Sequence, residues 1–263
     1  MPSDQLETLN RAVALMDCFT RDHPELGVRE AARMMSLSSS ATGRLMTALK
    51  KLGLLTQNPT TRSYALGPHV LAWAGVYSAN LDVRNAALPI LENLRMVTRE
   101  TISLYILEGD DRVCVERMES PQNVRIVTRV GKRLPLYAGS AGKVMLAFLP
   151  EERQEAILSS GQLNPLTEKT IVDPEALRSD LARIRQQGYA VSDGEWILDA
   201  AGVAAPIFDH NGEVIAGVSI SGPSSRFSAD LIEKYASRVT QAALHISKEM
   251  GYLPEVLSTI ETR

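Results

Sequence analysis

Cysteine and histidine are scarce in this sequence of 263 residues. It holds two cysteines, Cys18 and Cys114, and four histidines. Two cysteines are too few for a disulfide framework or, by themselves, for a zinc site, and the histidines lack the spacing of metal ligands. The composition is typical of a reduced intracellular protein. We therefore predict two small buried thiols, no metal and no cofactor.

Long hydrophobic runs are also absent. No window approaches the roughly 18 uninterrupted apolar residues that a membrane span needs. The first seven residues, Met-Pro-Ser-Asp-Gln-Leu-Glu, provide neither the basic nor the apolar region of a signal peptide. A composition of 44% hydrophobic and 22% charged residues excludes disordered and fibrous classes. We expect a cytoplasmic protein without a membrane partner.

Acidic residues are missing from Ala31 to Leu81. The average density, 31 acids in 263 residues, would place about six in such a stretch. The net charge of residues 1–67 is 8 − 6 = +2, and that of the remaining residues is 20 − 25 = −5. Together they give the total net charge of −3. Since phosphates repel carboxylates, an acid-free segment with scattered Lys and Arg favours a polyanion-binding face. A chance gap over buried helices is the alternative.

Hydrophobic periodicity predicts three helices in this N-terminal region. The first has one buried stripe, formed by Leu6, Leu9, Val13, Met16 and Phe19. The second covers Val28–Met35, after a break at His23–Gly27. The third follows the polar turn Ser36–Ser39, from about Ser39 to Leu52, and its inward stripe is Leu45, Leu49 and Leu52.

Two short strands follow the third helix. They are expected at Leu54–Thr56 and Ser63–Leu66, joined by a turn over Gln57–Arg62. Three helices and a hairpin within residues 1–67 predict a winged helix-turn-helix, which places its third helix in the DNA major groove. Arg44 could donate two bonds to a guanine edge, and small side chains permit close approach. The DNA-binding candidates are Arg29, Ser38, Ser39, Ser40, Thr42, Gly43, Arg44, Thr47, Lys50, Lys51, Thr61 and Arg62.

A nearly uncharged helix is expected next, from about His69 to Ala79, within a linker over residues 68–81. So apolar a helix needs a packing partner, which is either the same chain or a second subunit. Residues 82–263 then alternate helices with strands that suit antiparallel pairing, which predicts an α+β sensor domain. Its helices are expected at Arg84–Glu100, Ala141–Leu149, Pro174–Gln187 and Ala229–Met250. Its strands are expected at Thr101–Leu107, Arg112–Arg117, Val124–Thr128, Tyr189–Ser192, Val203–Phe208 and Val214–Ser221.

Several separated motifs resemble, in the right order, the IclR family of bacterial transcription regulators. Besides residues 1–67, they are Glu116–Pro121, Arg129–Leu136, Gly142–Ala147, Ala204–Asp209 and Ser219–Pro223. The resemblance runs nearly end to end. It implies a dimerising DNA-binding module, a GAF-like effector-binding domain over residues 82–263, and repression in preference to activation.

Candidate effector-binding residues come from this resemblance. The positions that match the family's pocket are Leu134, Ser140, Ala141, Ser192, Asp193, Ala200, Gly202, Ser219 and Ser221. Ser140 and Ala141 begin a predicted helix, whose free N–H groups favour an anionic ligand. In the run Glu195–Val203, Gly202 stands where many relatives have Cys, and Trp196, a further candidate, is bulkier than expected. The ligand's identity therefore does not carry over.

A serine hydrolase is the alternative function. Leu134–Gly142 resembles a nucleophile elbow around Ser140, with Ala138 in place of the first glycine. Asp193 and then His210 or His245 follow in hydrolase order, although such an order arises easily by chance. We favour instead a non-enzymatic, ligand-responsive repressor, a homodimer or dimer of dimers on a roughly palindromic operator, controlled by a small organic acid.

Overall fold

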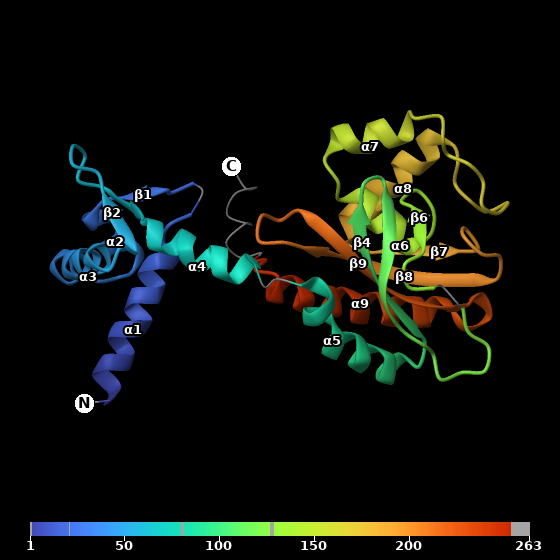
Figure 1. Ribbon diagram of the computed structural model, residues 1–263, viewed down its shortest axis with the longest axis horizontal. Helices are drawn as coiled ribbons and strands as arrows, with labels where there is room; N and C mark the ends of the chain where they lie inside the picture. The colour runs from blue at the N-terminus through green and yellow to red at the C-terminus, as the bar shows by residue number, and fades with distance from the viewer. Residues whose placement is uncertain (1, 21, 80–81, 127–128, 254–263) are drawn as a thin grey trace. The chain divides into compact units, whose positions relative to one another are not determined.

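The computed structural model describes residues 2–20, 22–79, 82–126 and 129–253. The chain forms two compact units, which divide between Leu81 and Asp82 (Figure 1). No helix among the described residues is long and apolar enough to cross a membrane.

The first unit is a winged helix-turn-helix, as predicted. Its elements are α1 (Pro2–Asp17), β1 (Glu25–Leu26), α2 (Val28–Met34), α3 (Ser39–Lys51), β2 (Leu55–Gln57), β3 (Tyr64–Leu66) and α4 (Pro68–Ala79). The strands form an antiparallel sheet in the order β1-β3-β2. The sequence did not predict β1, because its two residues become a strand only by pairing with β3, where Leu26 lies opposite Tyr64.

The buried stripes of α1 and α3 differ from those predicted. In α1, Leu9 is 61% and Val13 55% exposed, while Leu15 is fully buried. In α3 the buried residues are Thr42, Met46 and Leu49, and Leu52 is 63% exposed. The helices were correctly predicted, and Met16, Phe19, Leu45 and Leu49 belong to the core or pack against it as expected. The stripes are correct only in part, because periodicity alone cannot distinguish neighbouring faces when several hold apolar residues.

A close backbone contact fixes the base of the wing. The Gly67 N–H donates a hydrogen bond of 2.8 Å to the Leu54 carbonyl. A Cβ at Gly67 would lie only 2.2 Å from the Gly53 oxygen, so no other residue fits without a backbone shift. The end of α3 and the end of β3 are therefore held together, which sets the wing's position relative to α3.

The second unit is an α+β domain around one antiparallel sheet. Its strands are β4 (Thr101–Glu108), β5 (Asp111–Met118), β6 (Arg133–Pro135), β7 (Ala190–Asp193), β8 (Ala200–Phe208) and β9 (Val214–Pro223), in the order β6-β5-β4-β9-β8-β7. Its helices are α5 (Val83–Thr98), α6 (Ser140–Ala147), α7 (Glu151–Leu158), α8 (Pro174–Gln187), the short η1 (Ser224–Arg226) and α9 (Ala229–Glu249). In Figure 1, α5 and α9 cover one face, and α6, backed by α8, covers the other.

Three segments of the second unit depart from prediction. Val124–Ile126 is not a strand, and the last two residues of the strand expected there, 127–128, lie outside the described residues. The edge strand β6 was missed because it has only three residues. The helix α7 was missed because only Ile157 and Leu158 are buried, which leaves no apolar periodicity.

All eight residues of α6 are buried. The helix contacts β8, β9 and α8, so its first turn lies in the interior of the domain. Even Lys143 is only 1% exposed. Polar groups at this end of the helix must therefore find partners inside the protein.

Candidate DNA interface and effector cavity

The exposed face of α3 holds the principal candidates for DNA contact. Ser40, Arg44, Thr47 and Lys51 are all exposed. Ser38 caps the helix by accepting a 3.2 Å hydrogen bond from the Ala41 N–H. Arg44 Nη1 donates to Ser40 Oγ at 2.9 Å, which holds the guanidinium along the helix surface.

The wing is tied to α3 through Gln57. Lys50 Nζ donates to Gln57 Oε1 at 3.0 Å, and Gln57 Nε2 donates to the Arg62 carbonyl at 3.1 Å. Arg62 has φ +63°, a left-handed turn conformation, and its side chain and that of Thr61 are exposed. Lys50 therefore positions the wing and keeps an exposed ammonium beside it. Arg29 and Ser39 are exposed as well.

One of the predicted DNA contacts, Thr42, needs correction. Thr42 is fully buried, and its hydroxyl donates to the Ser38 carbonyl at 3.1 Å, so it cannot reach DNA. Its face of the helix belongs to the core. Gly43 is half-buried, and a Cβ there would make an ordinary 3.5 Å contact with Val28 Cγ1. No close backbone approach within the unit requires glycine at this position.

A cavity of about 50 Å³ opens beside the first turn of α6. It brings together eight of the ten effector candidates: Ser140, Ala141, Ser192, Trp196, Ala200, Gly202, Ser219 and Ser221. The lining residues that were not predicted are Tyr105, Arg112, Ile126, Gly139, Ile197 and Ala201.

Leu134 and Asp193 do not line this cavity. Leu134 belongs to the hydrophobic core, with 5% of its surface exposed. Asp193 is exposed, and its carboxylate accepts a hydrogen bond from Ser224 Oγ and lies 3.8 Å from Lys169 Nζ. Both were carried over from the family by sequence position, and here their side chains have other partners.

Arg112 is the functional candidate that sequence reasoning missed. It is 3% exposed, and Nη1 donates to the carbonyls of Pro135 and Ala138, the latter at 2.8 Å. Nε has no hydrogen-bond partner among the described residues. Burial lowers the pKa of this guanidinium, although nearby charges, including that of Glu195, favour its protonation. Strand alternation offered a signal, since Arg112 shares the inward face of β5 with the buried Cys114.

Two glycines at the start of α6 make room for this guanidinium. A Cβ on Gly142 would lie 2.1 Å from Arg112 Nη1, and one on Gly139 would lie 3.3 Å from Nη2. Gly139 also has φ +76°, which favours glycine. The cation therefore lies against the N-terminal end of a helix, where the helix dipole disfavours positive charge.

The prediction of free N–H groups at the start of α6 is wrong for Ser140. The Ser140 N–H donates to Ser192 Oγ at 2.9 Å, and the Gly139 N–H donates to Glu195 Oε2 at 3.0 Å. These donors already have acceptors within the domain. Among the residues that line the cavity, Arg112 supplies the formal positive charge.

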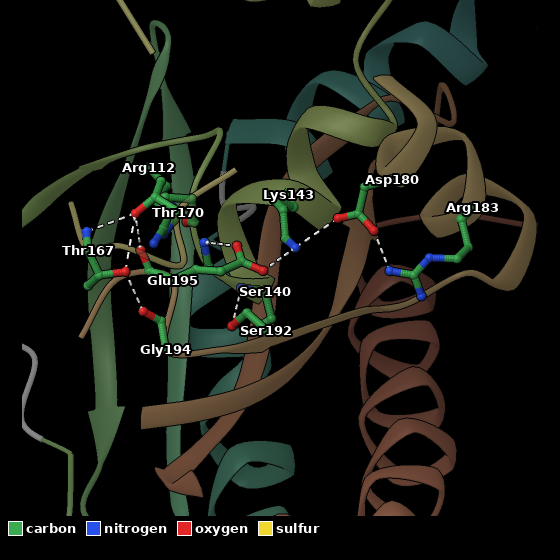
Figure 2. A network of polar contacts seen from close by, with 12 residues as sticks. Arg112, Ser140, Lys143, Thr167, Thr170, Asp180, Arg183, Ser192, Gly194 and Glu195 are labelled. Atoms are coloured by element: carbon green, nitrogen blue, oxygen red, sulfur yellow. Dashed lines mark hydrogen bonds and ion pairs between the residues drawn. The ribbon is translucent and has the colours of Figure 1, made fainter. Parts of the chain in front are cut away.

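Lys143 lies between two carboxylates in the interior (Figure 2). Its Nζ is 2.8 Å from Asp180 Oδ2 and 2.5 Å from Glu195 Oε1, and Arg183 binds the other oxygen of Asp180. Burial raises the pKa of Asp180, but the bonds from Lys143 and Arg183 outweigh it and leave the pKa below its usual value. Two cations balance two anions in this group, so the charge of Arg112 has no counterpart within it.

Residues Gly194–Asp199, here called the 194–199 segment, form one wall of the cavity. Its Trp196 and Ile197 line the space, and Lys132 Nζ lies 4.9 Å from the centre of the Trp196 ring. Thr170 Oγ1 donates to the Glu195 carbonyl at 2.7 Å, and Thr167 Oγ1 to the Gly194 carbonyl at 2.6 Å. Side chains outside the segment therefore hold its backbone.

The residues of the alternative hydrolase do not assemble around Ser140. Neither His210 nor His245 lines the cavity that holds Ser140. His245 faces outward from α9, 3.9 Å from Glu249. The Ser140 hydroxyl instead faces Gly202, where a Cβ would lie 2.9 Å from Oγ. Gly202 thus leaves space for Ser140 within the cavity wall.

Two family models and several known proteins match the chain. Residues 8–59 match the IclR helix-turn-helix domain, and residues 76–248 match the C-terminal domain of the bacterial transcriptional regulator IclR. The HTH-type transcriptional regulator KipR of Bacillus subtilis is 33% identical, over 94% of this chain and 98% of its own.

Solved structures agree with these matches. The crystal structure of an IclR transcriptional regulator from Silicibacter sp. TM1040 gives a TM-score of 0.86 at 26% identity, covering 94% of this chain and 96% of the other. An IclR homologue from Microbacterium hydrocarbonoxydans, crystallised with 4-hydroxybenzoate, gives a TM-score of 0.59 at 28% identity, covering 92% and 98%.

Proposed function

The chain belongs to the IclR family of bacterial transcription regulators, and we propose that it is a repressor that a small organic acid releases from its operator or repositions on it. The first unit binds DNA, and the cavity of the second unit binds the acid. Because its target is operator DNA, the protein acts in the cytoplasm.

The exposed face of α3 supports the DNA-binding role. In a winged helix-turn-helix this helix enters the major groove and the wing contacts the neighbouring backbone. Arg44 suits a guanine edge, while Lys51 and Arg62 suit phosphates. The segment from Ala31 to Leu81 has no carboxylate that would repel the backbone of the duplex.

The surface of α4 supports self-association. Leu71, Trp73 and Val76 are 76%, 57% and 69% exposed, and the helix has no charged residue. An apolar surface of this kind needs a partner in water. We take a second copy of the chain as the partner, which brings two DNA-binding units to a roughly palindromic operator. The assembly that we propose is such a homodimer or a dimer of two such dimers.

Arg112 carries the proposal of an acidic effector. Its buried guanidinium faces a cavity, lacks a carboxylate within ion-pair distance among the described residues, and keeps Nε unpaired. A carboxylate bound there would compensate the buried cation and accept charge-assisted hydrogen bonds. The homologue crystallised with 4-hydroxybenzoate, an aromatic acid, is consistent with this class of ligand.

The effector would act by shifting populations. A ligand changes DNA affinity only if it binds one arrangement of the protein better than another. Residues of β4, β5, β7, β8, β9, α6 and the 194–199 segment line the cavity, so a bound acid contacts several elements at once. Differential contact with these elements is the physical requirement for coupling to DNA binding.

Matched acids and amides test this function. Duplexes selected from a random pool by the full chain would serve as operator, and fluorescence anisotropy would report DNA affinity. We expect an acid such as benzoate, but not neutral benzamide, to stabilise the protein against heat and to change its DNA affinity. Equal effects of acids and their amides across a panel would refute the acidic effector. So would a preparation of this protein that binds DNA but responds to no acid.

The cavity also favours a regulator over the hydrolase, because no histidine faces Ser140 there. Ser140→Ala should keep DNA binding and the response to acid. Turnover of test esters by the wild type, lost in Ser140→Ala, would instead establish the enzyme.

A further inference from the structure

The effector cavity is small compared with typical pockets for small organic ligands. A water needs roughly 10–15 Å³ of such space, and pockets for drug-sized ligands span roughly 300–1,000 Å³. The cavity of about 50 Å³ therefore takes an acid of only a few non-hydrogen atoms. A larger acid requires one wall to move.

The 194–199 segment is the wall that can move with least disruption. Strands β4, β8 and β9 pair within the central sheet, and α6 is buried along its whole length. The segment, in contrast, has neither helix nor strand pairing between β7 and β8. It is held to the domain by hydrogen bonds, by one ion pair and by Trp196, which packs against the core and against Lys132.

Glu195 forms the ion pair that helps to hold the segment in place. It is 7% exposed, with Oε1 on Lys143 Nζ and Oε2 accepting the Gly139 N–H at 3.0 Å. Figure 2 shows its carboxylate directed away from the segment toward α6. Neighbouring Trp196 is thereby kept over the cavity.

We propose that Glu195 is a positioning residue that sets the upper size of the acid that the cavity admits; this inference rests on the proposed function. With its two bonds made, the 194–199 segment is closed and only small acids fit. When they break, Trp196 and Ile197 move outward and larger acids enter. The apparent affinity for a larger acid is then reduced by the fraction of molecules that are open.

The charges around Glu195 make its release feasible. Lys143 keeps Asp180 as a partner at 2.8 Å when Glu195 leaves, so its buried ammonium is not stranded. An incoming carboxylate also supplies Arg112 with the negative charge that Glu195 provides from a distance. The acid and Glu195 therefore compete for the same positive surroundings.

The test compares Glu195→Gln with Glu168→Gln, a control that removes an exposed carboxylate two residues from Thr170. Both changes are made in the full chain with Trp73→Phe, so that Trp196 is the remaining tryptophan. Binding of acetate, propionate, benzoate and phenylacetate is followed by calorimetry and Trp196 emission.

Because the apparent Kd varies inversely with the open fraction, Glu195→Gln should tighten benzoate and phenylacetate binding by roughly fivefold or more, and acetate binding by less than about twofold. In the parent, saturating benzoate but not acetate should alter Trp196 emission. Glu168→Gln should behave as the parent does.

Equal changes in Kd for small and large acids would overturn the proposal, because a merely structural or electrostatic role of Glu195 does not depend on ligand size. If Glu195→Gln fails to fold, Thr170→Val removes the bond to the Glu195 carbonyl and should show the same size dependence. If the parent binds no acid, the proposed function itself fails, and this inference with it.

Discussion

Arg112 Nη1 donates a 2.8 Å hydrogen bond to the carbonyl of Ala138, which joins β5 to the residue two positions before α6. The bond fixes a buried cation beside the positive end of a helix. The Ala138 carbonyl is uncharged, so this hydrogen bond does not neutralise the guanidinium. An anionic ligand would complete the arrangement.

Replacing Arg112 should abolish most acid binding. Arg112→Gln removes the charge that pairs with the carboxylate, and a hydrogen bond to a charged group contributes about 1.5–3 kcal/mol, so affinity should fall by roughly tenfold to a hundredfold. Arg133→Gln, on the exposed edge strand β6, is the control. Calorimetric titration with benzoate measures both, and equal affinities in the two variants would contradict the anchoring role.

Arg44 and Lys51 should have separable effects on DNA. If Arg44 contacts a base, Arg44→Ala should lose about 1–3 kcal/mol of discrimination between operator and unrelated duplex. If Lys51 contacts a phosphate, Lys51→Ala should weaken both duplexes alike and reduce the salt slope by about 0.9. Anisotropy at several salt concentrations distinguishes these outcomes. An unchanged footprint and affinity in Arg44→Ala would count against α3 as the recognition helix.

A charge on α4 should weaken self-association. Leu71→Glu places a carboxylate on an apolar surface, and the lost burial of one leucine is worth about 1.5–3 kcal/mol. Met96→Glu on α5, where the side chain is 60% exposed, is the matched control. Sedimentation velocity should show Leu71→Glu dissociating at protein concentrations at which the control stays associated. Identical behaviour would place the interface elsewhere.

Cys114 should make stability depend on pH in the alkaline range. Burial raises the pKa of its thiol from 9.0 to about 11, so the unfolded chain releases this proton before the folded chain does. The contribution is fully present below pH 9 and is lost as pH rises from about 9 to about 11. Urea midpoints of wild type should fall more steeply in that window than those of Cys114→Ala. Parallel curves would exclude the effect.

The order of elements could be predicted from the sequence because most signals are local. Ser38 and Asp173 cap α3 and α8 through their own side chains, and α8 has the predicted bounds Pro174–Gln187. Gly53, at φ +75°, follows the end of α3 as expected. Elements without such local signals, β1 and β6, were missed.

The composition of the cavity could be predicted only in part. Family motifs located Ser140, Ser192 and Gly202, which do line it. They misplaced Asp193, whose carboxylate binds Ser224 at the domain surface. Motif position specifies the strand or loop, whereas the direction of a side chain depends on the partners that the fold supplies.

By itself, the sequence determined a winged helix-turn-helix with an acid-free surface segment joined to an α+β domain, because caps, turns and periodicity act over a few residues. Only the tertiary structure decided that Thr42 faces the core and that Arg112, Lys143 and Glu195 gather at the start of α6. Lys143 and Glu195 are 52 positions apart, and burial forces such distant charges to find one another, since each would otherwise remain unpaired away from water.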